Sequence, residues 1–131
     1  MNEVMSQLPN IEIAATQSSP EVFADTSSGV LTMRGDSYPE NSFEFFAPII
    51  EWIERMLEVP EKPIHLDLHL LYLNTSSVKA MMDIFEILER AHGAGHAVSV
   101  KWSYAQQNSR IADLAEEFRE DCTFAFEIVQ N

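Results

Sequence analysis

One segment sets the architecture of this chain: Ile64-His65-Leu66-Asp67-Leu68-His69-Leu70-Leu71-Tyr72-Leu73-Asn74-Thr75-Ser76-Ser77-Val78-Lys79. Its first half alternates apolar and polar residues, which is the pattern of a strand buried on one side. Its second half places three hydroxyl side chains in front of apolar residues with helical spacing, which is typical of a helix N-terminus. The segment therefore predicts a strand, a tight turn and the start of a helix.

The predicted turn, Asn74 to Ser77, has three interpretations that the sequence leaves open. The first N–H groups of a helix lack intrahelical partners and carry the positive end of the helix dipole, so they stabilise an oxygen or an anion. The turn is therefore a structural N-cap, a phosphate-binding turn or a phosphorylation switch, and a phosphorylated hydroxyl adds a charge of roughly −1.5 to −2. Spacing alone favours the cap.

The composition bounds the class of protein. The 131 residues suffice for one domain with a real hydrophobic core, so we expect a single domain over residues 1–131 with a loosely ordered lead-in over 1–9. The 21 acidic and 8 basic residues give a formal net charge of −13, which repels nucleic acid and anionic membrane surfaces. We therefore expect neither nucleic acid nor a membrane as a partner.

Cysteine usage and the N-terminus indicate the compartment. The single cysteine, Cys122, cannot form an internal disulfide and is not part of a zinc pattern, and its apolar surroundings predict a small core residue. Residues 1–6 contain neither a basic region nor a long apolar run, and no window of the chain approaches the length of a membrane span. These features predict a cytoplasmic protein.

Outside the central segment, strand and helix patterns alternate. Further strands are expected at 11–14, 21–24, 29–34, 96–102 and 122–129, with a hairpin loop between the second and the third of these. One helix is expected from Pro39 and Glu40 to before Pro60, and another from Ile111 to Phe118. Between them, a helix with the apolar stripe Val78, Met81, Met82, Phe85 and Leu88 is expected to end at Gly93 and Gly95. Three aromatic residues of the first helix lie outside its narrowest apolar stripe: Phe43, Phe45 and Trp52. The default interpretation is that they widen the buried face of the helix, and the alternative is that they form an aromatic surface for a partner.

Strands separated by helices predict an α/β fold with parallel crossover connections, preceded by an antiparallel hairpin. Strands covered on both faces are nearly continuous apolar runs, yet the central strand has His65, Asp67 and His69 on one face. The following strand likewise has Ser99 and Lys101 on one face. We therefore predict a mixed β-sheet with helices mainly on one face and a polar, partly open opposite face.

His65, Asp67 and His69 also suggest an alternative, a small metal-dependent enzyme, because zinc accepts imidazole and carboxylate ligands. A full site needs fixed geometry and supporting hydrogen bonds, and a solvated sheet face explains the same residues without a metal. No G-x-S-x-G motif surrounds Ser76 or Ser77, and the four glycines are too scattered for a phosphate loop. We therefore expect no enzymatic activity, no bound metal and no cofactor.

Four segments occur in order along the chain: Thr16-Gln17-Ser18-Ser19-Pro20, Gly35-Asp36-Ser37-Tyr38-Pro39-Glu40-Asn41, Tyr72-Leu73-Asn74-Thr75-Ser76-Ser77 and Trp102-Ser103-Tyr104. Together they resemble the SiaC family of bacterial biofilm-regulation phosphoproteins. The resemblance covers nearly the whole chain. It implies a single SiaC-like domain with a fold similar to the STAS domains of anti-sigma-factor antagonists.

The resemblance also implies a partner-switching function. In the family, a threonine at the start of the helix after the central strand is phosphorylated by a serine/threonine kinase, SiaB, and dephosphorylated by a PPM-type phosphatase, SiaA. The matching residue here is Thr75. The unphosphorylated family protein binds and activates a diguanylate cyclase, SiaD, so cyclic di-GMP signalling, biofilm formation and aggregation follow its phosphorylation state.

This sequence departs from the family pattern after Trp102. The segment Gln106-Gln107-Asn108-Ser109 stands where the family usually has an acidic stretch, and Arg119 stands where a glycine is expected. These differences leave the switch residue in place. They bear on which kinase, phosphatase or effector the protein uses.

The expected partner-binding surface surrounds Thr75. Its predicted members are Tyr72, Asn74, Ser76 and Ser77 on the central segment, and Tyr38, Pro39, Glu40 and Asn41 in the preceding loop. For the loop, a purely structural role is an equally good interpretation. Unmodified Thr75 leaves a neutral surface, whereas its phosphate adds a hydrated dianion that a close interface must pair or desolvate. A further alternative is a structural subunit in which Thr75 is only a helix cap.

Overall fold

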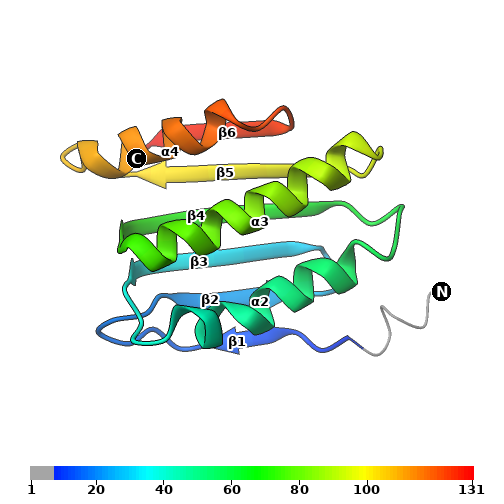
Figure 1. Ribbon diagram of the computed structural model, residues 1–131, viewed down its shortest axis with the longest axis horizontal. Coiled ribbons are helices and arrows are strands. Elements are labelled where there is room, and N and C mark those ends of the chain that lie inside the picture. Colours follow the sequence, from blue (N-terminus) through cyan, green and yellow to red (C-terminus); the bar gives the residue numbers. More distant parts are fainter. Residues whose placement is uncertain (1–7) are drawn as a thin grey trace.

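The computed structural model describes residues 8–131, which form a sheet layer and a helix layer (Figure 1). The six strands lie side by side in chain order. They are β1 (Ile11–Ile13), β2 (Glu21–Asp25), β3 (Val30–Ser37), β4 (Ile64–Leu73), β5 (Val98–Tyr104) and β6 (Ala125–Gln130). The helices of the described residues are α2 (Ser42–Met56), α3 (Thr75–Gly93) and α4 (Ser109–Glu120).

The strand directions confirm the predicted mixed sheet. β1, β2 and β3 are antiparallel neighbours, whereas β3, β4, β5 and β6 are parallel to one another. Each parallel connection contains one helix: α2 between β3 and β4, α3 between β4 and β5, and α4 between β5 and β6. The chain therefore has the predicted α/β architecture with an antiparallel start.

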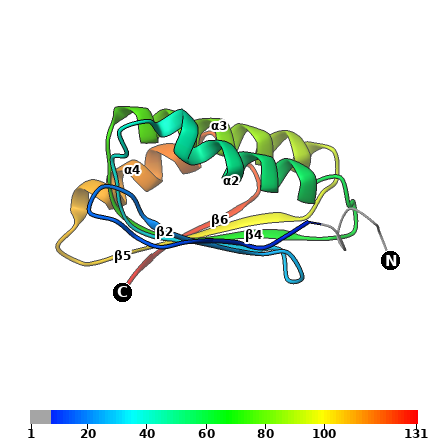
Figure 2. The same cartoon turned by 90° about the horizontal axis from the view of Figure 1, so that it is seen from below.

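All three helices cover the same face of the sheet (Figure 2). Leu66, Leu68 and Leu70 of β4 point into the core between the layers and are completely buried. The alternate residues of β4, including His65 and His69, are only half-buried on the opposite face. The predicted polar, partly open face is therefore present, because no helix of residues 8–131 covers that side of the sheet.

A bulge at the end of β4 directs side chains outward beside the start of α3. Gly35 of β3 pairs with Leu70, but the next residue, Asp36, pairs with Tyr72, so Leu71 is the extra residue. Gly35 has a φ of +116°, which glycine adopts without a steric penalty. The bulge interrupts the alternation of β4. Leu71 and Tyr72 are consequently both exposed, at 42% and 53%, and Leu73 returns to the core.

Asparagine side chains set where the helices begin. α2 begins at Ser42 and not at Pro39 or Glu40 as predicted, because the Asn41 side chain accepts the Glu44 N–H at 3.0 Å. The other two helices start in the same way. Each has an asparagine cap followed by a hydroxyl residue, and the three pairs are Asn41-Ser42, Asn74-Thr75 and Asn108-Ser109.

The buried faces of the helices differ from prediction at two positions. Trp52 is 2% exposed and its Nε1–H donates to the Thr26 hydroxyl at 3.0 Å, so it widens the core as predicted. Phe43, in contrast, is 85% exposed. On α3, Met82 was predicted in the apolar stripe but is 48% exposed, because Ile84 completes the buried face instead.

The predicted loose lead-in over 1–9 falls mainly on residues 1–7, which lie outside the described residues. Leu8 packs against the core, and the Asn10 side chain accepts the Thr26 N–H at 2.8 Å. Between residues 8 and 131, no helix has both the length and the apolar character needed to cross a membrane.

Candidate partner-binding site

The N-termini of the three helices gather at one end of the sheet, because each follows the carboxyl end of a parallel strand. Two hydrogen bonds join neighbouring segments there. The Asn74 N–H donates to the Ser37 carbonyl at 3.0 Å, and the Asn108 side-chain amide donates to the Leu71 carbonyl at 3.0 Å. The start of α3 is thereby held between the ends of β3 and β4 and the start of α4.

Thr75 occupies the first position of α3 and is exposed. The N-cap is Asn74, whose side chain accepts the Ser77 N–H at 2.9 Å. Within residues 8–131, the Thr75 hydroxyl has no hydrogen-bond partner. The alternative in which Thr75 is only a cap is therefore wrong, since Asn74 supplies the capping oxygen and leaves the Thr75 hydroxyl accessible.

The two serines after Thr75 have different environments. Ser76 is exposed, with its hydroxyl 2.6 Å from that of Ser42 on α2 and 3.2 Å from the Asn74 side-chain oxygen. Ser77 is completely buried, with its hydroxyl 2.8 Å from that of Ser37. Ser77, predicted as a contact residue, therefore joins α3 to β3 and is not part of the surface.

The structure brings the predicted loop next to Thr75. The Tyr38 and Tyr72 rings meet edge to face with centroids 6.0 Å apart, and both side chains are partly exposed. The Tyr38 N–H donates to the Ser18 carbonyl at 2.7 Å, which anchors the loop to the turn before β2. Glu40 is exposed and Pro39 half-buried, while Asn41 is committed to capping α2. We call the exposed group the Thr75 corner, and it comprises Tyr38, Glu40, Tyr72, Thr75 and Ser76.

Sequence reasoning missed two hydroxyls that build this corner, Ser37 and Ser42. Both act through pairing with residues of α3 that are distant in sequence, so spacing within either segment does not reveal them. The signal available for Ser42 was the repeated asparagine–hydroxyl pair, which marks three helix starts. Parallel strands then place those helix starts together.

The residues of the metal alternative are not brought together as a site. They lie on the open sheet face, where His65 Nδ1 is 2.7 Å from the Ser99 hydroxyl and Asp67 is in register with Lys101. Among residues 8–131, no group of three or more His, Cys, Asp or Glu side chains is placed to hold a metal ion. The described geometry therefore offers nothing to support the metal-dependent enzyme.

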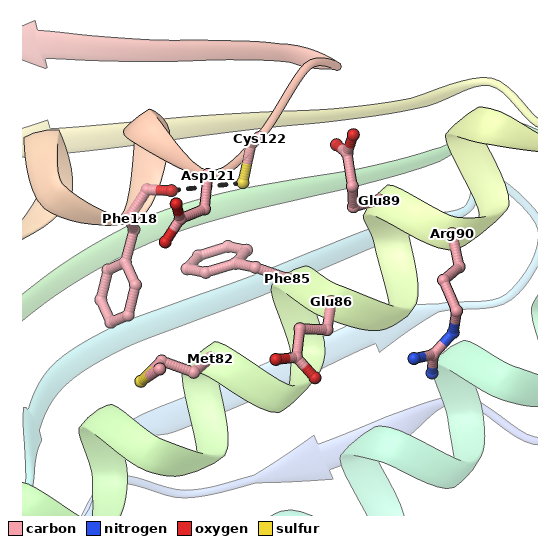
Figure 3. A pocket seen from close by; sticks show the side chains of 8 residues that line it. All are labelled: Met82, Phe85, Glu86, Glu89, Arg90, Phe118, Asp121 and Cys122. Atoms are coloured by element: carbon pink, nitrogen blue, oxygen red, sulfur yellow. Dashed lines mark hydrogen bonds between the residues drawn. The ribbon is translucent and has the colours of Figure 1, made fainter.

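A hollow of about 290 Å³ lies on the other flank of α3 (Figure 3). This α3–α4 hollow is lined by Met82, Phe85, Glu86, Glu89, Arg90, Phe118, Asp121 and Cys122. The Cys122 thiol donates to the Phe118 carbonyl at 3.3 Å, and the Phe85 and Phe118 rings are 5.0 Å apart. Burial, together with the nearby carboxylates Glu89 and Asp121, raises the pKa of Cys122 to about 11. The thiol is therefore neutral near pH 7 and a poor nucleophile.

With this geometry in place, comparison with known proteins decides the family. The model of the SiaC family regulatory phosphoproteins matches residues 13–131. The chain belongs to the SiaC family. It is 54% identical over 121 residues to an uncharacterized protein of Pseudomonas aeruginosa, a match that covers 92% of this chain and 96% of that protein. The predicted resemblance is thus confirmed.

Solved structures of SiaC share the fold. SiaC of Pseudomonas aeruginosa is 52% identical and superposes with a TM-score of 0.89, covering 95% of this chain and all of the other. A second structure holds the diguanylate cyclase SiaD in complex with its activator SiaC from the same organism. That match is 55% identical with a TM-score of 0.90, covering 92% of this chain and 99% of the other. The Pseudomonas SiaC is therefore an activator of a diguanylate cyclase.

Proposed function

We propose that this protein is a phosphorylation-controlled partner-switching regulator. The form unphosphorylated on Thr75 binds and activates a SiaD-like diguanylate cyclase, and so controls cyclic di-GMP and biofilm formation. The activator role of the Pseudomonas SiaC supports the choice of partner. The observation that carries the choice of switch residue is the exposed Thr75 hydroxyl at the first position of α3, with the cap supplied by Asn74.

Phosphorylation at this position changes the surface and not the fold. Because Asn74 makes the cap, a phosphate on Thr75 adds charge beside an intact helix start. A screened attraction between exposed charges about 4 Å apart is worth ~1 kcal/mol in water, whereas an unpaired charge buried at an interface costs roughly 3–5 kcal/mol. Where the partner covers Thr75, the cost of desolvating the phosphate therefore exceeds the gain from its attraction to nearby positive charge. We expect the phosphorylated form to bind the cyclase about 100-fold less tightly or weaker still.

Two opposing enzymes complete the proposal: a SiaB-like serine/threonine kinase and a SiaA-like PPM-type phosphatase. The exposed Thr75 corner supports access by both enzymes. The unusual segment 106–109 lies at the same end of the sheet, because Asn108 caps α4 and bonds to the Leu71 carbonyl. A paralogous effector or kinase that reads this segment is the alternative to a SiaD-like partner.

The experiment compares two variants in binding to a purified SiaD-like cyclase. Thr75→Ala should bind and activate as the unmodified protein does, because the substitution removes neither the cap nor the surrounding surface. Thr75→Asp should bind much more weakly. Incubation with the kinase and labelled ATP should place phosphate on wild type and not on Thr75→Ala. Equal affinities of the two variants would contradict the proposal.

A further inference from the structure

A groove between α2 and α3 begins at the Thr75 corner. It encloses about 540 Å³, and Ser42 and Ser76 lie at the end next to the corner. Ala47 and Ile50 of α2 and Ala80 of α3 contribute apolar surface to its walls. The groove is thus continuous with the surface around the proposed switch residue, and it is open to a partner that covers this surface.

Phe43 stands at the same end of the groove and is 85% exposed, more than any other large hydrophobic side chain of residues 8–131. Phe43, Ala47 and Ile50 follow one another at helical spacing, so they form one apolar stripe along α2. An exposed aromatic side chain at the rim of an apolar groove is the usual composition of a binding anchor. Ile50 is partly buried against the core, whereas Phe43 and Ala47 are exposed.

The charged residues along the groove indicate which kind of partner segment it can bind. Glu51 and Glu54 of α2 and Asp83 of α3 line it, and the one basic lining residue, Lys79, lies 3.7 Å from Asp83. The groove is therefore acidic beside an apolar stripe, in a chain of formal net charge −13. A complementary partner presents apolar side chains flanked by lysine or arginine.

We propose that the α2–α3 groove binds a basic amphipathic helix of the partner, with Phe43 as its anchor. The helices α2 and α3 run parallel (Figure 1), and the apolar stripe lies along α2. A third helix can pack its apolar face into the groove between two such helices, as in helix-in-groove recognition. This inference rests on the proposed function, because it identifies how the cyclase docks.

The position of Thr75 explains how a phosphate opposes docking into an acidic groove. Thr75 and Lys79 are four residues apart on one face of α3, so a phosphate on Thr75 competes with Asp83 for the Lys79 ammonium. The phosphate and its hydration shell then occupy the end of the groove next to Ser76. A helix seated on Phe43 must displace that hydration.

The test measures binding of SiaD of Pseudomonas aeruginosa to the unphosphorylated protein. Phe43→Ala should weaken binding at least about tenfold, as loss of an aromatic anchor does. Glu51→Lys combined with Glu54→Lys should also weaken binding and reduce its dependence on salt. Met82→Ala is the matched control, because Met82 is an exposed apolar residue on the other flank of α3 (Figure 3) and should leave the affinity within about twofold.

A photoreactive cross-linker at the exposed Ala47 identifies the occupant independently of affinity. The expected product joins Ala47 to a cyclase segment whose basic and apolar residues recur at helical spacing. Unchanged affinity of Phe43→Ala, or cross-links to a loop or an acidic segment, would contradict docking in the groove and leave the proposed phosphorylation switch unaffected. Loss of binding by Phe43→Ala without any effect of Thr75→Asp would support docking in the groove and contradict Thr75 as the switch residue. Failure of the wild type to bind any cyclase would reject both.

Discussion

The two flanks of α3 are built from the same kinds of side chain but present different surfaces. Toward α2, an open groove carries the largely exposed ring of Phe43 and ends at Ser76, next to the exposed Thr75. Toward α4, the hollow contains the nearly buried rings of Phe85 and Phe118 and a neutral thiol. Aromatic residues near a cavity therefore do not by themselves mark a binding surface. Exposure and continuity with the proposed switch residue distinguish the α2 flank.

The starts of α3 and α4 likewise combine similar residues with different surroundings. Asn74-Thr75 and Asn108-Ser109 have the same local chemistry, an asparagine cap and an exposed hydroxyl at the first helical position. Ser76, the residue after Thr75, lines the groove, and the Tyr38 and Tyr72 rings pair at the same corner. Ser109, in contrast, adjoins the exposed polar residues Gln107 and Arg110. Local sequence provides a modifiable hydroxyl, and the tertiary surroundings determine whether modification affects a partner.

The largest expected effect on partner binding comes from comparing aspartate at the two helix starts. Thr75→Asp should weaken cyclase binding by at least about tenfold, because a carboxylate carries about half the charge of the phosphate, whereas Ser109→Asp should change it by less than about threefold. Both variants should fold normally, since an acidic residue in the first turn is favourable to a helix. Isothermal titration calorimetry gives the two affinities. Similar losses at both sites would show that total charge at this end of the sheet, and not the Thr75 corner, controls binding.

The thiol of Cys122 in the α3–α4 hollow should react slowly with alkylating reagents while the protein is folded. Raising the pKa of Cys122 from 9.0 to about 11 means that the folded state retains the proton through this range. At pH 8 the thiolate fraction, and with it the alkylation rate, should be about 100-fold lower in the folded protein than in urea. The rate should rise with pH and reach about half of its maximum near pH 11. Because Cys122 is the single cysteine, iodoacetamide labelling followed by mass spectrometry reads this site alone.

The same reagent reports where the partner docks. A cyclase that occupies the α2–α3 groove should leave the alkylation rate of Cys122 unchanged. Strong protection of Cys122 in the complex would place the partner over the α3–α4 hollow and reverse the assignment of the two flanks.

The smallest effect concerns the caps. Asn74→Ala and Asn108→Ala should each lower the free energy of unfolding by about 1 kcal/mol, because each removes a side-chain oxygen that accepts a backbone N–H of the first helical turn. Urea denaturation measures both. Asn74→Ala should in addition weaken cyclase binding, because the Asn74 oxygen also accepts the Ser76 hydroxyl in the corner. Thr75→Ala should leave stability unchanged within about 0.5 kcal/mol, and a larger loss would restore a capping role to Thr75.

The elements and their arrangement followed from local patterns. Alternation in β4 predicted an uncovered polar face, and the order of strands and helices predicted parallel connections, because side-chain period and crossover rules act over short distances. The family resemblance was likewise carried by short segments in a fixed order. These features do not depend on contacts between distant residues.

The missed features all depend on such contacts. Ser77 is buried because its hydroxyl pairs with that of Ser37, which is distant in sequence. The exposure of Tyr72 beside Leu71 follows from the bulge opposite Gly35, which alternation alone does not reveal. The groove beside the exposed Phe43 became visible only in the structure. The candidate site therefore required the structure, although Thr75 itself did not.

Control of the cyclase by Thr75 phosphorylation can be measured as diguanylate cyclase activity in the presence of the phosphorylated and unphosphorylated forms of this protein. Wild type would be phosphorylated stoichiometrically by the SiaB-like kinase, verified at Thr75 by mass spectrometry, and a part of it then treated with the PPM-type phosphatase. We predict that the phosphorylated form leaves the cyclase at its basal rate and that the dephosphorylated form restores full activation. Equal activation by the two forms would contradict the account.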